Sequence, residues 1–480
     1  MDVNNSLNGS FEIQVFESTY IFKFIKIDLH SLNDIDKLMT KNIFIIGAGR
    51  STPALIKYLV ELSFKENIQL TIADKDFRFL PVEFADHERV KTIFFDVFDA
   101  DQRALEIQKA DLVISMLPAH LHLKVAKDCV AFMKPMVTAS YVSKEIRSLH
   151  EKATQKGVLL LNEMGLDPGL DHMSAMKIID EIKSKGGSLK SFKSFCGGLI
   201  APDSDTNPWQ YKFTWNPHNV ILAGQGTAKY LEGGQYKYIP YHQLFQRTTP
   251  VRVPDYGDFE AYANRDSISY RSIYQLKDVT TLLRGTLRRP GFAEAWNLFV
   301  QMGMTDDSYE MNVSAMTYRS FFTSFLMLGN RSIEDCLKSD FGASNLVVEK
   351  VKWLGFFDDT SIELCLSSPA QVLQKLLEDK WRLDASDKDM IVMQHQFTYE
   401  LESEIHELHS SLVLVGHDQI QTAMSMTVGL PLAIAAKRIL KGEIKTVGVA
   451  VPVSKEMYLP ILAELEQFGI QFIEQNVSKV

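Results

Sequence analysis

From residue 42 onward, short apolar runs alternate with longer segments of helical periodicity. NIFII (42–46), QLTIA (69–73), TIFF (92–95), LVISM (112–116), PMVTA (135–139) and VLLL (158–161) have the length and composition of buried strands. The segments between them, such as ALIKYLVELSF and AHLHLKVAKDCVAFM, space apolar residues as a helix does. Apolar strands that alternate with helices are typical of a parallel sheet covered on both faces. We therefore predict an α/β fold with a Rossmann dinucleotide-binding domain at residues 41–163.

The pattern changes after residue 163. Residues 190–285 are rich in Phe, Tyr, Gly, Pro and Thr, which favours a mixed or antiparallel sheet, whereas residues 291–380 have mainly helical periodicity. DMIVMQHQFTYEL and HSSLVLVG then resemble a pair of strands. We predict a large inserted mixed α+β domain at 164–423, with a helical subdomain at about 291–380, and a C-terminal return to the Rossmann domain at 424–480.

Residues 1–40 precede this rhythm. FEIQVF and YIFKFIKIDL alternate apolar and polar residues, but forty residues bury too little surface to fold alone. We predict an extension outside the functional fold, and the alternative is an edge strand added to the main fold.

The composition narrows the class of protein. The 480 residues contain 51 Lys and Arg against 60 Asp and Glu, and this net charge of −9 argues against nucleic acid as the main partner. Four widely spaced cysteines form no CxxC pair, which favours reduced thiols. No apolar run reaches the roughly 18 residues of a membrane span, and the first residues lack the basic start of a signal peptide. We therefore expect a cytoplasmic protein without a membrane partner. We expect no metal site, because the histidines of HELH (406–409) have the wrong spacing for the zinc motif HExxH.

A glycine turn directly follows the first predicted strand. In IIGAGRST, Gly47 and Gly49 permit a tight turn and a close approach of a pyrophosphate to the start of the next helix. Asp74 ends the second strand, where a carboxylate favours the ribose of NAD, but its neighbour Lys75 could meet the 2′-phosphate of NADP. The charge argument favours NAD, with NADP as the alternative. The loops after the third and fourth strands place Asp96 and Val97 near the adenine and Leu117 near the nicotinamide.

Longer motifs identify a family. LLLNEMGLDPGLDHMSAMKIIDEI (159–182), SFCGGLIAPDSDTNPWQYKFTW (194–215), NRDSISY (264–270), LRGTLRRPGF (283–292) and KDMIVMQHQF (388–397) resemble the saccharopine dehydrogenase family, in particular its glutamate-forming type. The resemblance runs from about residue 41 to 480. It implies a homodimeric NAD(P)-dependent oxidoreductase of lysine metabolism. This activity reversibly oxidises saccharopine to L-glutamate and α-aminoadipate semialdehyde.

The turn and the resemblance together predict the site residues. The expected cofactor contacts are Gly47, Ala48, Gly49, Arg50, Ser51, Asp74, Lys75, Asp96, Val97, Leu117, Leu166, Asp167, Pro168 and Asn216. The expected substrate contacts are Ser140, Tyr141, Asp167, Arg265, Thr286, Leu287 and Arg288. The chain departs from the family in its shorter loop GAGRSTP, in Asp74-Lys75 where NADP-type members have an uncharged residue and an arginine, and in Asn216 where a serine is usual.

These residue types suit the expected chemistry. Saccharopine carries three carboxylates, and the arginines 265, 284, 288 and 289 form the available cluster of cations that could pair with them. Asp167 and Tyr141 are the candidates for moving protons or orienting water. Asp167 could equally cap the following helix, and the arginines could lie on solvated strands.

Two other functions compete with this interpretation. A relative that reduces another imine, such as one that forms carboxynorspermidine, would need fewer arginines because its product has fewer carboxylates. A non-catalytic NAD-sensing protein with the same fold would bind the cofactor without turnover.

Overall fold

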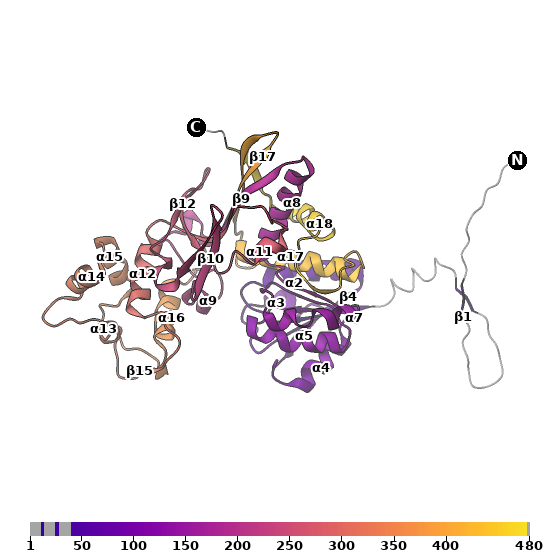
Figure 1. The fold of residues 1–480 in the computed structure, drawn as a ribbon. Coiled ribbons are helices and arrows are strands. Elements are labelled where there is room, and N and C mark those ends of the chain that lie inside the picture. The colour runs from indigo at the N-terminus through magenta and orange to yellow at the C-terminus, as the bar shows by residue number, and fades with distance from the viewer. Residues whose placement is uncertain (1–10, 14–24, 28–39, 478–480) are drawn as a thin grey trace.

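The computed structural model describes residues 11–13, 25–27 and 40–477, and it contains two large sheets (Figure 1). Most of the predicted extension at residues 1–40 lies outside the described residues. Of its two alternating segments, β1 (Phe11–Ile13) and β2 (Ile25–Ile27) pair with each other in antiparallel fashion. In the described part of the chain, neither strand joins another sheet.

The first large sheet is parallel, in the strand order β19-β8-β7-β6-β3-β4-β5. Its strands are β3 (Lys41–Ile46), β4 (Ile68–Asp74), β5 (Val90–Phe94), β6 (Leu112–Ser115), β7 (Met136–Thr138), β8 (Leu159–Leu161) and β19 (Gly448–Ala450). Its connecting helices are α2 (Pro53–Glu66), α3 (Val82–Ala85), α4 (Ala100–Lys109), η1 (Ala119–Leu121), α5 (His122–Ala131), α6 (Lys144–Arg147) and α7 (His150–Gln155). The Rossmann fold predicted from the alternating strands and helices is confirmed.

The second large sheet is mixed. Its main path runs β11-β10-β14-β9-β17-β18-β20, and the hairpin β12-β13 joins it through β14. The strands are β9 (Ser188–Ile200), β10 (Thr227–Glu232), β11 (Gln235–Pro240), β12 (Thr249–Val253), β13 (Gly257–Ala263), β14 (Thr281–Arg288), β17 (Asp389–Leu401), β18 (Glu404–Val415) and β20 (Ile473–Asn476). The helices α8 (Leu170–Ser184), η2 (Pro202–Ser204), α9 (Pro217–Ile221), α10 (Tyr241–Leu244) and α11 (Tyr270–Ile273) accompany it.

A helical lobe extends from the mixed sheet, on the left in Figure 1. It contains α12 (Phe292–Met302), α13 (Tyr318–Thr323), α14 (Ile333–Phe341), α15 (Asn345–Leu354), α16 (Pro369–Lys380) and the short pair β15 (Met311–Asn312) and β16 (Leu366–Ser367). Aromatic side chains, among them Trp209, Trp296 and Trp381, form its own core. The helical segments predicted at about 291–380 lie in this lobe.

The C-terminal part of the chain serves both sheets. Helix α17 (Ala423–Leu440) packs so closely on α2 that a Cβ at Gly429 would lie 2.8 Å from the backbone nitrogen of Leu55. After β19, helix α18 (Lys455–Leu465) and η3 (Glu466–Phe468) lead to β20, which pairs with β18 of the mixed sheet. The prediction that residues 424–480 return to the Rossmann domain therefore does not hold for the last strand, β20, which belongs to the mixed sheet. Among the described helices, α17 alone has the length and apolarity of a membrane span, and 72% of it is buried within the protein.

Candidate active site

The glycine turn lies at the carboxyl end of β3. Gly47 has a φ of +107°, and a Cβ there would lie 2.8 Å from the carbonyl oxygen of Met116, so glycine is required. The Thr52 hydroxyl donates to the Gly49 carbonyl at 2.7 Å, and Pro53 begins α2 immediately afterwards. The turn thus directs the N-terminus of α2 to the end of the sheet, where dinucleotide folds bind pyrophosphate.

Asp74 is tied to this turn. Its carboxylate accepts hydrogen bonds from the backbone N–H groups of Ala48 at 2.6 Å, Lys75 at 2.6 Å and Asp76 at 3.1 Å. A carboxylate offers about four acceptor positions, so most of its capacity is used within the protein. Asp74 therefore stabilises the turn, and few of its acceptor positions are left for the ribose hydroxyls of NAD.

Cations gather beside the same turn. The guanidinium carbon of Arg50 lies 4.8 Å from the centre of the Phe79 ring. Burial lowers the pKa of Arg50, with Glu378 of the helical lobe opposing this shift and Arg78 adding to it. Lys75 lies close by in sequence, and its ammonium pairs with Asp96 at 3.0 Å. Arg78 was not anticipated from the sequence.

A buried histidine links the ends of β6 and β7. His122 contacts the Ser115 hydroxyl through Nδ1 at 2.8 Å and the Ser140 hydroxyl through Nε2 at 2.7 Å. Burial lowers the pKa of His122 to about 4, so the imidazole is neutral at pH 7. The expected substrate residue Ser140 is therefore held in place by a residue that the sequence analysis did not single out.

The predicted pair Tyr141 and Asp167 comes together at the junction of the two domains. The Tyr141 hydroxyl donates to Asp167 Oδ1 at 3.2 Å. Arg284 reaches the pair from β14, and its Nη2 donates to Asp167 and, at 2.8 Å, to Asp171 Oδ2. Arg284 is only 3% exposed, so this guanidinium is buried. Two carboxylates share it.

The two carboxylates titrate differently. Burial raises the pKa of Asp167, Arg284 offsets this only in part, and the charge of Asp171 adds to the rise. Burial acts in the same direction on Asp171, but His172, Arg284 and the N–H of Gly169 outweigh it and lower its pKa. Asp167 is therefore the member of the pair that can hold a proton, whereas Asp171 stays charged.

A further layer of polar groups supports this cluster. His172 on α8 contacts Glu163 Oε2 through Nε2 at 2.8 Å and the Tyr274 hydroxyl through Nδ1 at 2.6 Å. The Tyr270 hydroxyl donates to Glu163 at 3.1 Å, and its ring lies 4.3 Å from the guanidinium carbon of Arg284. These residues were not predicted, although Glu163 and His172 flank the GLDPG motif and polar residues on a buried helix face would have been a usable signal.

Arg288 projects from the same strand as Arg284. Alternate residues of a strand share a face, so Arg284, Thr286 and Arg288 point the same way, and the two arginines are about 13 Å apart along β14. Arg288 is 3% exposed and lies over the rings of Tyr211 at 5.0 Å and Phe292 at 5.3 Å. It donates to the Leu287 carbonyl at 2.9 Å and has no ion pair within the described chain. Burial acts to lower the pKa of Arg288, but the tyrosines 262 and 211 and the acid Glu260, its register partner on β13, raise it. Arg288 is thus a buried cation that forms no direct ion pair within the described chain.

The other expected substrate residues fall on different faces. The guanidinium carbon of Arg265 lies 5.3 Å from the Tyr141 ring centre, on the side that also carries Asp167. Leu287 points to the opposite face of β14 and packs in a core with Phe195 and Phe259, so its side chain does not reach the cluster. Strand alternation turns the Leu287 side chain away from the cluster, and the substrate contact expected of Leu287 stays a prediction.

The remaining expected cofactor residues are mostly buried or engaged locally. Asn216 caps α9 through its side chain, Val97 and Leu166 are buried, and Leu117 is half-buried against the core below β5 and β6. The buried thiol of Cys196, whose pKa is raised by burial and then by Asp167, was not given a role in the sequence analysis. Arg284 was expected among the cations for substrate carboxylates, and the structure places it on Asp167 and Asp171 instead.

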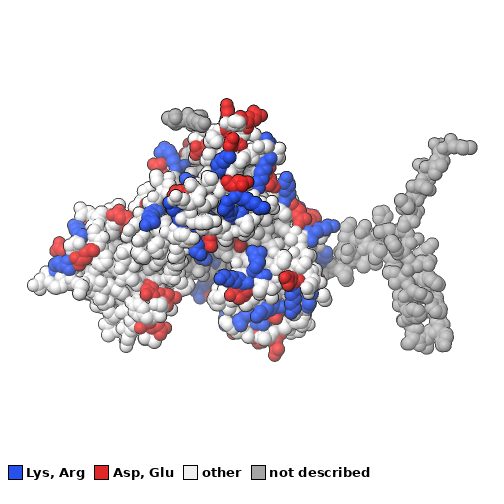
Figure 2. All heavy atoms as spheres, in the orientation of Figure 1, with Lys and Arg blue, Asp and Glu red and all other residues white. Residues whose placement is uncertain are grey.

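Figure 2 shows the setting of the site. The surface is hollowed between the helical lobe and the Rossmann domain, and basic side chains are visible inside this hollow. Basic side chains are also frequent over the Rossmann domain, with acidic ones between them. A hollow with basic groups suits ligands that carry phosphates or carboxylates.

Comparisons with known proteins agree with this geometry. The family model of the saccharopine dehydrogenase NADP binding domain matches residues 43–161, and that of the saccharopine dehydrogenase C-terminal domain matches residues 165–470. The chain belongs to the saccharopine dehydrogenase family. The family predicted from the motifs is thereby confirmed.

Individual relatives cover most of the chain. The saccharopine dehydrogenase [NADP(+), L-glutamate-forming] of Saccharomyces cerevisiae is 33% identical over 92% of this chain and all of its own length. The alpha-aminoadipic semialdehyde synthase of Arabidopsis thaliana is 35% identical over 80% of this chain, which spans only 38% of that longer protein. The solved apo structure of the L-Glu-forming saccharopine dehydrogenase from S. cerevisiae superimposes with a TM-score of 0.82 at 32% identity, covering 91% of this chain and all of that one.

The comparisons favour NADP over NAD. The matching family model is an NADP-binding domain, and the yeast relative is named for NADP(+). The preference for NAD drawn from Asp74 is corrected accordingly. Its carboxylate is turned to the glycine turn, and Arg50 lies beside that turn, whereas Lys75 and Arg78 form ion pairs with Asp96 and Asp76.

Proposed function

We propose that this protein is an NADP-dependent saccharopine dehydrogenase of the glutamate-forming type. The observation that carries the proposal is that Tyr141 and Asp167 lie beside β14, whose two buried arginines, Arg284 and Arg288, share one face of the strand. The family membership supports it, since relatives with this activity in their names align along nearly the whole chain. Carboxynorspermidine formation is not favoured, because its product offers fewer carboxylates to these cations.

The turn at residues 47–53 fits a dinucleotide. Gly47 leaves room that a Cβ would fill, and α2 starts directly beyond the turn. Gly47, Ala48, Gly49 and Ser51 would hold the pyrophosphate, and Arg50 with Arg78 and Lys75 would face the 2′-phosphate of NADP. When bound, the oxidised nicotinamide accepts a hydride from the ε-carbon of the lysyl part of saccharopine.

Substrate recognition is assigned to Arg288 and Arg265, which form no ion pair among the described residues. Arg288 would pair with one carboxylate of saccharopine, and burial among aromatic rings strengthens such a charge-assisted bond. Arg265, which is exposed beside Tyr141, would meet a second carboxylate. Arg284 is already shared by Asp167 and Asp171, so it orients the acids and does not bind substrate.

Proton transfer is assigned to Asp167. The secondary amine of saccharopine must lose a proton before hydride loss, and Asp167, whose pKa is raised by burial and which lies beside Tyr141, would accept that proton. Loss of hydride leaves an iminium ion, and addition of one water then yields the aldehyde and the ammonium group of glutamate. The Tyr141 hydroxyl stays protonated, because burial raises its pKa, and it would orient the attacking water as a hydrogen-bond partner.

A homodimer in the cytoplasm stays a prediction of the sequence.

A steady-state assay tests the function. The purified full chain is incubated with saccharopine and either NADP⁺ or NAD⁺, and reduced nicotinamide is followed by absorbance while glutamate is quantified. We expect turnover with NADP⁺ at a kcat/KM at least about tenfold above that with NAD⁺, together with one glutamate per hydride. No reduction with either cofactor would reject the enzymatic proposal, and a preference for NAD⁺ would reject the roles given to Arg50 and Arg78.

A further inference from the structure

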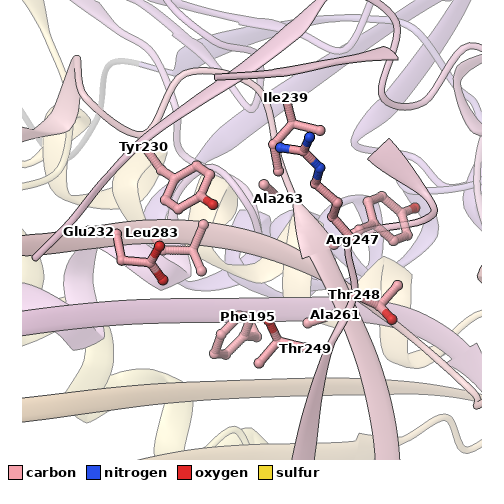
Figure 3. Close-up of a pocket in the computed structure, with 11 residues that line it drawn as sticks. Phe195, Tyr230, Glu232, Ile239, Arg247, Thr248, Thr249, Ala261, Ala263 and Leu283 are labelled. Atoms are coloured by element: carbon pink, nitrogen blue, oxygen red, sulfur yellow. The ribbon is translucent and has the colours of Figure 1, made fainter. Parts of the chain in front are cut away.

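A pocket lies where the mixed sheet divides. Strand β14 pairs with β10 at Leu231 and Leu282, but farther along its length the same edge pairs with β13. The strands diverge between these pairings and leave a cavity of about 150 Å³ (Figure 3). Phe195 of β9, Leu283 of β14 and Ala261 of β13 give this cavity, here called the sheet pocket, an apolar floor.

Charges of both signs line the sheet pocket. Glu232 and Tyr230 come from β10, whereas Arg247 and the two threonines Thr248 and Thr249 come from the segment that enters β12. In Figure 3 Glu232 and Arg247 lie on opposite sides of the apolar floor. They make no ion pair with each other, and within the described chain the Glu232 carboxylate has no hydrogen-bond or ion-pair partner.

Arg247, like Glu232, is exposed at the rim of the sheet pocket and forms no ion pair among the described residues. Its Nη2 donates to the amide oxygen of Gln243 at 2.6 Å, which leaves other N–H groups for a ligand. Tyr230 lies within the electrostatic reach of both charges, since its pKa is raised first by burial and then by Glu232, with Arg247 opposing. The two charges therefore flank one small volume.

The size and charge of the sheet pocket select one class of ligand. A cavity of about 150 Å³ accommodates a molecule the size of benzene, which excludes a dinucleotide. Arginine pairs with carboxylates, glutamate accepts hydrogen bonds from ammonium groups, and the floor suits methylene groups. The matching ligand is an amino acid with its carboxylate and its ammonium at opposite ends of a short aliphatic chain.

The sheet pocket is connected to the candidate active site by backbone hydrogen bonds. Next to Tyr230, the Lys229 N–H donates to the Arg265 carbonyl at 2.8 Å, and the Lys229 carbonyl accepts from the Ser267 N–H at 2.8 Å. The Ser267 hydroxyl in turn accepts from the Arg284 N–H at 2.9 Å. Side chains alternate along β14, so Leu283 faces the sheet pocket while Arg284 faces Asp167 on the other side.

From this arrangement we propose that the sheet pocket is an effector site for a small ω-amino acid, and that its occupancy changes the affinity of the active site for saccharopine. A ligand held between Glu232 and Arg247 shifts β10, which positions the backbone of Arg265. The effect on turnover rests on the function proposed above, whereas binding to the sheet pocket does not.

Calorimetric titration of the full chain with 5-aminopentanoate tests the binding. We expect saturable binding. Its Kd should rise at least about tenfold in Glu232→Gln, and by a similar factor in the separate variant Arg247→Gln, because each substitution removes one charge-assisted contact. Pentanoate lacks the ammonium and pentylamine lacks the carboxylate, so each should bind at least about tenfold more weakly. Glu404→Gln, an exposed carboxylate at the start of β18, is the matched control and should leave the Kd unchanged.

The outcomes separate the two proposals. Absence of binding, or binding that both pocket variants leave unchanged, overturns the effector site. With binding established, saturating 5-aminopentanoate should change the saccharopine KM at least about twofold in the wild type and not in Glu232→Gln, whose basal kinetics should match the wild type. Binding with an unchanged KM overturns the connection to Arg265. If saccharopine is not turned over at all, the proposed function fails while the titration still decides the fate of the sheet pocket.

Discussion

Replacing Arg288 by methionine separates a functional cation from a structural one. Methionine fills a similar volume between Tyr211 and Phe292 but carries no charge. Arg288 is 3% exposed, donates to the Leu287 carbonyl at 2.9 Å, and its Nε is buried without a partner in the described structure. A side chain selected for stability alone would have its hydrogen bonds satisfied and its charge paired.

The magnitudes follow from these contacts. Arg288→Met loses one charged hydrogen bond, worth about 1.5–3 kcal/mol, and ring contacts worth roughly 0.5–2 kcal/mol. It also removes the desolvation penalty of an unpaired buried cation, which is several kcal/mol. These opposing terms leave the free energy of unfolding within about 2 kcal/mol of the wild type. With saccharopine bound, the lost charge-assisted contact should raise KM about 10- to 150-fold.

Urea unfolding and steady-state kinetics on the same preparations measure both quantities. Arg289→Met is the matched control: Arg289 is half-buried, donates to the Tyr256 carbonyl at 3.1 Å and lies over Phe259, so its loss should leave the saccharopine KM unchanged. The KM for NADP⁺ should be near the wild-type value in both variants. An Arg288→Met protein that loses more than about 3 kcal/mol of stability and keeps the wild-type KM would show that Arg288 is a core residue and refute the assignment.

Three further predictions address the rest of the site. Asp167→Asn should lower kcat about 10²- to 10⁴-fold and abolish the acid limb of the pH–rate profile. In the wild type this limb lies above the ordinary carboxyl range, because the pKa of Asp167 is raised. An intact limb in the variant would assign the proton to another group. Arg50→Ala should raise the KM for NADP⁺ at least about tenfold while the KM for NAD⁺ changes little, with the half-buried Lys57→Ala on α2 as control. Equal effects on both cofactors would contradict contact with the 2′-phosphate. The folded-state pKa of His122 is about 4, below the unfolded value of 6.5, so the unfolded chain binds more protons between these values and stability falls as pH decreases. Urea unfolding should show His122 contributing a loss of about 2 kcal/mol at pH 5 relative to pH 7.5, and a His122→Gln protein with an unchanged pH dependence would refute this.

Local features of the fold were predictable from the sequence. The glycine turn at Gly47 and the alternation of strands and helices depend on neighbouring residues, so periodicity and turn composition were sufficient to predict the Rossmann fold. Tyr141 and Asp167 were also anticipated, through motifs resembling the family, and the structure brings them within 3.2 Å.

Features that depend on distant pairing were not predictable. Arg284 and Asp167 are 117 residues apart in sequence, and no local pattern indicates which of the four clustered arginines reaches the acids. The choice of β18 as the partner of β20 is likewise a matter of tertiary packing, which is why the end of the chain was assigned to the wrong sheet. The direction of the Asp74 carboxylate was the third such feature. The sequence gives its charge, but it does not indicate that the carboxylate accepts a hydrogen bond from the Ala48 N–H.

The sharing of Arg284 explains why the site needs a second cation so far along the strand. Both Asp167 and Asp171 occupy the same guanidinium nitrogen, and this arrangement holds Asp171 charged while leaving Asp167 able to take up a proton. A substrate carboxylate placed at Arg284 would compete with both acids and raise the local negative charge. Recognition therefore falls to Arg288, about 13 Å away on the same face of β14, where no acid among the described residues forms an ion pair with the guanidinium. The separation of a proton-handling cluster from a carboxylate-binding cation on one strand allows the substrate to bind without disturbing the group that must accept its proton.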